Sequence, residues 1–193
     1  TIYQNSPLNR VVAAFAPGNS WAGSEGYPYG DNNKVERKIK TEYNSNTSAD
    51  NVKIWAITND GLVTNDYGAD GNILSGVNIP ALAPGVQVYP EGVLLKTTIT
   101  DENLNKMVEY KDKNGRVILK KVQAAETADG AYSGWLSTYY VYDDYGNLRF
   151  VISPKAVAKM LTDNVWNINQ ALADELCFSY EYDSRQRLIA KKV

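Results

Sequence analysis

Two stretches near the C-terminal end of the chain share one pattern of apolar and polar positions. Residues 140–151 and 180–191 align without gaps, and both read Tyr-x-Tyr-Asp, then a polar loop, then Leu. Side chains two positions apart in an extended strand share a face, so the two tyrosines of each stretch point the same way. Each stretch is therefore predicted to be a β-hairpin. The residues that define the pattern are Tyr140, Tyr142, Asp143, Gly146, Leu148, Tyr180, Tyr182, Asp183 and Leu188.

The loop of the first hairpin has the chemistry of a tight turn. Asp143 can accept hydrogen bonds from backbone N–H groups within the turn, and Gly146 can take the left-handed conformation that closes a bulged hairpin. Gln186 stands in the place of this glycine in the second copy. Either the glutamine adopts the same conformation, at a cost of about 1 kcal/mol, or the second turn has another geometry.

Three weaker copies of the pattern precede these two. Residues 109–119 carry Tyr110 and Gly115 and fit the pattern with one extra loop residue. Residues 67–73 keep its spacing from tyrosine to glycine, and residues 3–11 fit it with a longer loop. The chain is therefore predicted to contain five hairpins. Alternation or β-branched residues predict further strands at 34–43, 52–58, 86–89, 93–100 and 137–141.

One region departs from the strand pattern. Ser153 followed by Pro154 is a typical helix start, and apolar residues then recur at helical spacing. Asn169 can cap a second short helix. The predicted fold class is all-β, with antiparallel hairpin repeats forming a curved or spiralling sheet and one or two short helices near 154–176. Because no interior linker divides the chain, we expect residues 1–193 to form a single domain.

Composition excludes most catalytic classes. The 193 residues include no histidine and a single cysteine, Cys177, so a Ser-His-Asp triad, a Cys-His dyad, a histidine-ligated metal and an intrachain disulfide are excluded. Lys plus Arg (20) nearly balances Asp plus Glu (22), which leaves no basic field for a nucleic acid. The longest apolar run, 11–16, is far below the ~18 residues of a membrane span. We expect no catalytic activity, no cofactor, no nucleic-acid partner and no membrane span.

Paired carboxylates are the remaining route to catalysis, because glycosidases use them without histidine. The candidate pairs are Asp66 with Asp70, Asp143 with Asp144, and Asp101 with Glu102. Asp143 and Asp183 occupy equivalent turn positions, however, so capping of hairpins explains these acids more economically than catalysis does. A calcium site at Asp66, Asp70 and Asn72 lacks the ligand spacing of a helix-loop-helix calcium site.

Aromatic residues suggest a second kind of function. The chain has 14 Tyr against 3 Phe, and it has 4 Trp. Tyrosine suits half-buried sheet surfaces, while flat aromatic faces also suit sugar rings and the anchors of protein partners. Trp135, which follows Gly134, is the tryptophan that we expect to be exposed and available to a ligand, whereas core packing explains the others better.

The pattern Tyr-x-Tyr-Asp-x-x-Gly-x-Leu resembles the YD-repeat, or Rhs (rearrangement hot spot), family of large bacterial proteins, which has relatives in animal teneurins. The resemblance covers residues 108–120 and 137–193, and residues 3–21 and 153–157 also look like Rhs-type proteins of Bacteroidetes. The family implies antiparallel hairpins joined into a long spiralling sheet. Family repeats recur at about twenty residues, whereas Tyr110, Tyr142 and Tyr182 lie 32 and 40 residues apart.

The resemblance implies a non-catalytic structural module cut from a much larger secreted or cell-surface protein. In the family, the sheet forms a hollow shell that encloses a toxic C-terminal domain or displays it at the cell surface. The implied partners are neighbouring repeats of the same full-length chain and an enclosed toxin domain. The alternative is a carbohydrate- or protein-binding surface module that uses exposed aromatic residues, with glycans as partners.

Overall fold

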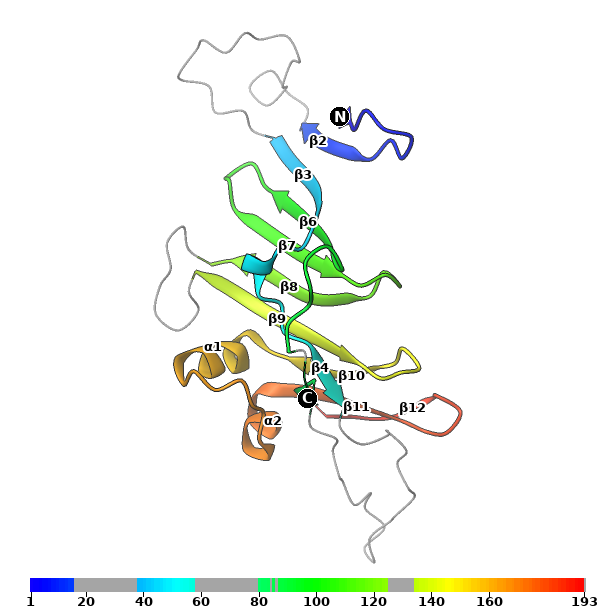
Figure 1. The fold of residues 1–193 in the computed structure, drawn as a ribbon, viewed down its shortest axis with the longest axis vertical. Helices are drawn as coiled ribbons and strands as arrows, with labels where there is room; N and C mark the ends of the chain where they lie inside the picture. The colour runs from blue at the N-terminus through cyan, green and yellow to red at the C-terminus, as the bar shows by residue number, and fades with distance from the viewer. Residues whose placement is uncertain (16–37, 58–79, 84, 86, 125–133, 193) are drawn as a thin grey trace, which may run out of the picture.

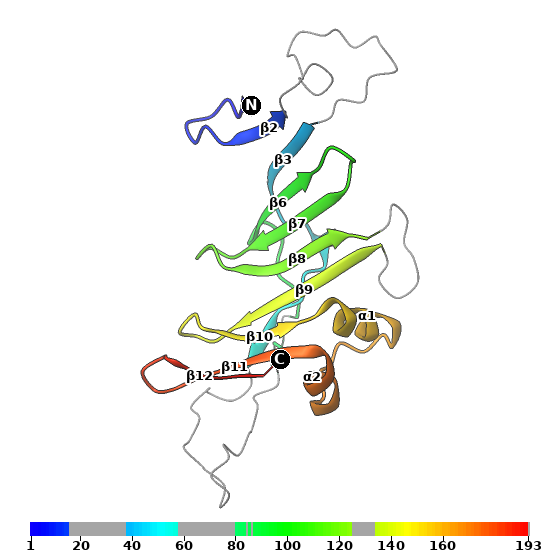
Figure 2. The same cartoon turned by 180° about the vertical axis from the view of Figure 1, so that it is seen from behind.

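The computed structural model describes residues 1–15, 38–57, 80–83, 85, 87–124 and 134–192 (Figure 1). Within these residues, a ten-stranded antiparallel sheet runs the length of the molecule, and a second sheet of two strands lies beside it (Figure 2). The strands of the large sheet, in spatial order, are β1 (Ile2–Tyr3), β2 (Val11–Phe15), β3 (Lys38–Ser45), β6 (Leu95–Thr100), β7 (Lys106–Lys111), β8 (Val117–Gln123), β9 (Trp135–Tyr142), β10 (Leu148–Ile152), β11 (Cys177–Tyr182) and β12 (Leu188–Lys192). The small sheet pairs β4 (Trp55–Ile57) with β5 (Pro80–Leu82). The predicted all-β fold class is confirmed.

Four of the five predicted hairpins are present. They are β1–β2, β7–β8, β9–β10 and β11–β12, each with antiparallel pairing between its two strands. The fifth, at 67–73, lies outside the described residues. The strand expected at 86–89 is reduced, in its described part, to a single bridge between Lys53 and Val88.

Both predicted helices form between β10 and β11, with the caps that the sequence indicates. Helix α1 (Pro154–Thr162) begins after Ser153, whose side chain accepts a hydrogen bond from the Ala156 N–H at 3.3 Å. Helix α2 (Gln170–Leu176) begins after Asn169, whose side chain accepts from the Leu172 N–H at 2.9 Å. A single 3₁₀ turn, η1 (Ser48–Asp50), follows β3.

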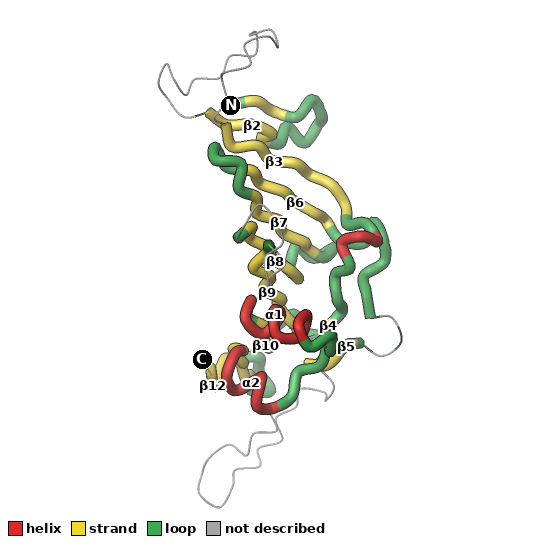
Figure 3. Tube along the Cα trace, turned by 90° about the vertical axis from the view of Figure 1, so that its left-hand side faces the viewer, coloured by secondary structure: helices red, strands yellow, loops and turns green. Residues whose placement is uncertain are grey.

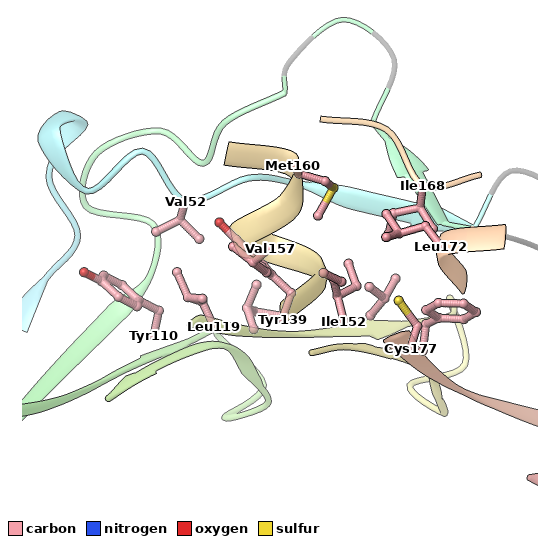
Figure 4. Packing of buried hydrophobic residues seen from close by; sticks show 14 of the residues in the cluster. Val52, Tyr110, Leu119, Tyr139, Ile152, Val157, Met160, Ile168, Leu172 and Cys177 are labelled. Atoms are coloured by element: carbon pink, nitrogen blue, oxygen red, sulfur yellow. The ribbon is translucent and has the colours of Figure 1, made fainter. Parts of the chain in front are cut away.

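The core lies between one face of the sheet and a layer formed by α1, α2 and the paired strands β4 and β5 (Figure 3, Figure 4). The rings of Trp55, Tyr139 and Trp166 join these layers, with centroids 6.1 to 6.3 Å apart. Helix residues Val157 and Met160 fill the space above β9 and β10 (Figure 4). The apolar core therefore belongs to the second half of the sheet, where the Tyr-Asp hairpins are.

Buried polar contacts fasten η1 to the sheet. The Asp50 carboxylate accepts from the Tyr110 hydroxyl at 2.8 Å and pairs with Lys96 at 2.7 Å. Burial alone would raise the pKa of Asp50, but the Lys96 ammonium and the Thr47 N–H, together with Tyr110, hold it below the usual value. Asn46 is also buried, and its amide donates to the Pro90 carbonyl at 2.8 Å.

Tyr110 departs from the role that the sequence alignment assigns to it. The β7–β8 hairpin has no extra loop residue. Its Gly115 N–H donates to the Asp112 carbonyl, just as the Gly146 N–H donates to the Asp143 carbonyl in the β9–β10 hairpin. Alignment on these aspartates places Tyr110 on the core face, where it is 2% exposed. Side-chain direction alternates along a strand, so a shift of one residue moved the predicted tyrosine to the wrong face.

Candidate functional site

Four hairpin turns share one five-residue geometry, which we call the Asp turn. The four turns span residues 101–105, 112–116, 143–147 and 183–187. In each, the N–H of the first residue, an aspartate, donates to the carbonyl of the fifth residue at 2.9 to 3.0 Å. The fourth residue has a positive φ, and its N–H donates to the aspartate carbonyl at 2.8 to 3.0 Å. Gln186 has a φ of +60°, so the turn without glycine has the same geometry as the turn of Gly146.

The aspartate side chain holds each Asp turn closed. Its Oδ1 accepts from the backbone N–H of the fifth residue at 2.8 to 2.9 Å, and its Oδ2 accepts from the side chain of that residue at 2.7 to 3.1 Å. The fifth residues are Asn105, Arg116, Asn147 and Arg187. The N–H and guanidinium of Arg187 hold the pKa of Asp183 below its usual value. Asp101 and Asp143, proposed above as members of acid pairs, are thus engaged in their own turns.

Replacing Gly146 with valine is expected to lower the free energy of unfolding by about 1–2 kcal/mol, because a β-branched residue is strained in the left-handed conformation. A Cβ there would meet only Arg116 Nη1, at 3.5 Å, so the cost arises in the backbone. Gly115→Val should behave likewise. The opposite change, Gln186→Gly, should raise the free energy of unfolding by up to about 1 kcal/mol. Urea denaturation measures all three, and unchanged midpoints would show that the fourth position carries no strain.

Hairpins β7–β8, β9–β10 and β11–β12 are structural repeats. Each has its Asp turn at the same side of the sheet (Figure 1). The residues that flank the turns pair identically, with a register shift at the same place: Lys111 with Val117, Tyr142 with Leu148, and Tyr182 with Leu188. Tyr142 and Tyr182 are both half-buried. The three hairpins therefore share the pairing of their strands as well as their sequence pattern.

Strand β12 nearly repeats the sequence of β8. Residues 116–121 and 187–192 both read Arg-apolar-Ile-apolar-Lys-Lys. The two strands differ in what lies beside them, because β8 pairs with β9, whereas β12 pairs only with β11 among the described residues. Ile118 on β8 is accordingly 7% exposed, while the equivalent Ile189 on β12 is 48% exposed. The edge at β12 thus has the sequence of an interior strand.

In hairpins β9–β10 and β11–β12, the first tyrosine lies on the strand that pairs with the preceding hairpin. Continuing the β8–β9 register by one residue brings Ile118 opposite Tyr140, and continuing the β10–β11 register brings Arg149 opposite Tyr180. Arg149 Nε donates to the Tyr180 carbonyl at 3.1 Å, and the arginine is 7% exposed. Burial raises the pKa of Tyr140. The sequence pattern also predicts an open edge at the final hairpin strand, 188–193, which a further repeat could cover, and the repeated Arg-x-Ile-x-Lys-Lys is an additional signal that marks it.

Trp135 is less exposed than its sequence neighbours suggest. It begins β9, is half-buried against the core, and has Lys121 Nζ 5.2 Å from its ring centroid. The glycine and serine before it predicted an exposed loop, but pairing with β8 places the ring at the sheet. Trp55 and Trp166 also pack on the core, and Trp21 lies outside the described residues.

No metal centre is assembled in the described part of the chain. No group of three or more cysteine, aspartate or glutamate side chains gathers there in a way that suits a metal ion. Asp66, Asp70 and Asn72 lie outside the described residues. Burial raises the pKa of the Cys177 thiol to about 11, so this cysteine is a poor nucleophile near neutral pH.

Among the helices that the structure describes, none has the length and apolar character needed to cross a membrane.

No protein-family model, curated protein or solved structure matches the chain. Within the described residues β12 pairs on one side only, and this edge is the candidate functional site on its geometry alone.

Proposed function

We propose that the chain is a non-catalytic structural module of a larger secreted or cell-surface protein of the YD-repeat (Rhs) type, in which the sheet continues across β12 into a further hairpin. The module supplies part of the wall of a shell that encloses or displays a C-terminal effector domain. The observation that carries the proposal is the exposure of Ile189, 48%, beside that of its equivalent Ile118, 7%.

Each hairpin in the array completes the one before it. Strand β9 pairs with β8, where Ile118 is 7% exposed, and β11 pairs with β10, where Arg149 is 7% exposed. We therefore expect an added hairpin to bury the side chain that its predecessor leaves open. Arrays of this kind gain stability from the interfaces between neighbours. Lys191 and Lys192 meanwhile protect the bare edge from indiscriminate pairing, which is a common use of lysine on edge strands.

A carbohydrate- or protein-binding surface is the second candidate, and the aromatic rings argue against it. Stacking on a sugar requires a free ring face, but three of the repeat-region rings have a cation over them. The pairs are Arg116 with Tyr142, Lys191 with Tyr180, and Lys121 with Trp135, at 5.1 to 5.8 Å from the ring centroids. Specific glycan binding that is lost in Trp135→Ala would promote this candidate over the structural role.

The proposal is tested by amide hydrogen exchange at β12, first in this chain alone and then in the longer protein. In the isolated chain we expect β12 amides to exchange much faster than those of β8, because the outward N–H groups of an edge strand lack partners. In the longer protein the two strands should be protected alike. Equal, fast exchange at β12 in both proteins would overturn the proposal, as would turnover of a glycosidase or protease substrate that Asp143→Asn abolishes.

A further inference from the structure

We infer that the edge of β12 accepts one kind of strand: an antiparallel strand with two short hydroxyl residues opposite Lys191 and Lys192 and a tyrosine opposite Ile189. This inference rests on the proposed function and specifies the chemistry of the strand that completes the sheet. Its template is the interface between β8 and β9 in the same sheet.

The template pairs lysines with hydroxyl residues. Lys120 of β8 stands opposite Thr138 of β9, and Lys121 stands opposite Ser137. Opposed residues on neighbouring strands approach closely, so short polar partners leave room for the lysine stems and avoid like-charge repulsion. Because β12 carries the same two lysines at equivalent positions, the same partners suit it.

The first lysine of each pair, Lys120 on β8 and Lys191 on β12, extends toward the preceding strand of the sheet. Lys120 Nζ lies 3.9 Å from a carboxylate oxygen of Glu109, on the preceding strand β7. The equivalent Lys191 Nζ lies 5.8 Å from the ring centroid of Tyr180, on the preceding strand β11. In both strands the ammonium group of this lysine contacts a residue of the preceding strand. The space beside the following strand is then left to a short side chain.

The other hairpin interface shows that the acceptor sequence matters. Strand β10 has no lysines at these positions, and there Val151 and Ile152 face Phe178 and Cys177 of β11. Apolar acceptor residues are thus matched by apolar or aromatic partners, whereas the lysine pair of β8 is matched by hydroxyls. Because β12 carries the lysine pair of β8, we expect it to pair with a strand that carries hydroxyl residues as β9 does.

The inference is tested by extending the full chain with a second copy of its own residues 123–152, placed after Val193. Val193 occupies in the sequence the place of Val122, so the added copy presents a β9–β10 hairpin to β12 with its natural linker. Amide exchange at Ile189 to Lys192 is then compared with exchange at β8, which serves as the internal reference for a folded chain. We expect β12 exchange to slow at least about tenfold relative to the unextended chain.

Two variants of the added copy isolate the lysine–hydroxyl match. Ser137→Lys with Thr138→Lys, made only in the added copy, places like charges opposite each other and should abolish the protection of β12. Ser137→Thr with Thr138→Ser keeps both hydroxyls and should retain it. Tyr140→Ala in the added copy should leave Ile189 uncovered and weaken the protection.

The outcomes of these exchange measurements separate the inferred specificity from the proposed continuation of the sheet. Equal protection of β12 by the original copy and by the double-lysine variant would overturn the inferred specificity and leave the proposed function standing. Failure of every added hairpin to protect β12 would overturn the continuation of the sheet itself. A dimer of the unextended chain in sedimentation, with β12 amides protected, would assign the edge to a second copy and overturn the inference.

Discussion

Replacing Ile118 with alanine is expected to lower the free energy of unfolding by about 2–5 kcal/mol, whereas the same replacement at Ile189 is expected to cost less than about 1 kcal/mol. The two isoleucines occupy equivalent places in nearly identical strands. Ile118 is 7% exposed and belongs to the core cluster, while Ile189 is 48% exposed. Truncation removes well-packed atoms only at the first position, so the difference measures what coverage by β9 contributes.

The measurement is urea denaturation of the two variants beside the unmodified chain. In the chain extended by residues 123–152, the cost of Ile189→Ala should rise toward that of Ile118→Ala, because the added strand buries this side chain. Equal costs at the two positions in the unextended chain would contradict the account, since they would mean that Ile189 is already covered.

Replacing Asp143 with alanine is expected to lower the free energy of unfolding by about 3–5 kcal/mol, the cost of leaving a buried charge without its partner. Asp143 Oδ2 lies 3.5 Å from Arg149 Nη1, and their side chains are 12% and 7% exposed. The carboxylate also accepts the N–H and the side-chain amide of Asn147 in its turn. Removal therefore opens the turn and leaves the buried guanidinium with its hydrogen bond to the Tyr180 carbonyl but without a carboxylate partner.

Asp183→Ala is the matched control, because Asp183 makes the same turn bonds without a buried arginine. Its partner Arg187 is 69% exposed, so its charge stays solvated and the loss of stability should be much smaller. Adding Arg149→Met to Asp143→Ala should recover much of the lost stability by removing the stranded charge. Equal losses for the two aspartates, with no recovery in the double variant, would show that turn closure alone explains the effect.

Local chemistry was enough to predict the hairpins and the helix starts. Asp143 bonds within its own turn, and Gly146 takes the left-handed conformation at φ +87°. Ser153 and Asn169 cap their helices. All of these depend on residues within five positions of one another, so their hydrogen bonds are set by short stretches of sequence. The turn at Leu104, with a φ of +68°, escaped prediction because leucine gives no sign of that conformation.

The local pattern predicted the half-buried Tyr142 and Tyr182 but not the environment of every side chain. Tyr110 matches the repeat tyrosines in sequence, yet it lies in the core and donates to Asp50, which is 60 residues away. Trp135 follows a glycine and a serine, yet it is half-buried at the start of β9. Both outcomes depend on which strand or turn packs alongside, and that choice is made by long-range pairing.

Period-two alternation and turn chemistry act over a few residues, so the antiparallel hairpins and their aspartate turns could be predicted from short stretches of sequence. The environment of the two similar strands depends on the tertiary structure, in which β8 pairs on both sides, whereas β12 pairs only with β11 among the described residues. Their sequences are nearly the same, so no local signal distinguishes Ile118 from Ile189. The difference arises from the neighbouring strand, since burial is a property of what lies beside a residue in space.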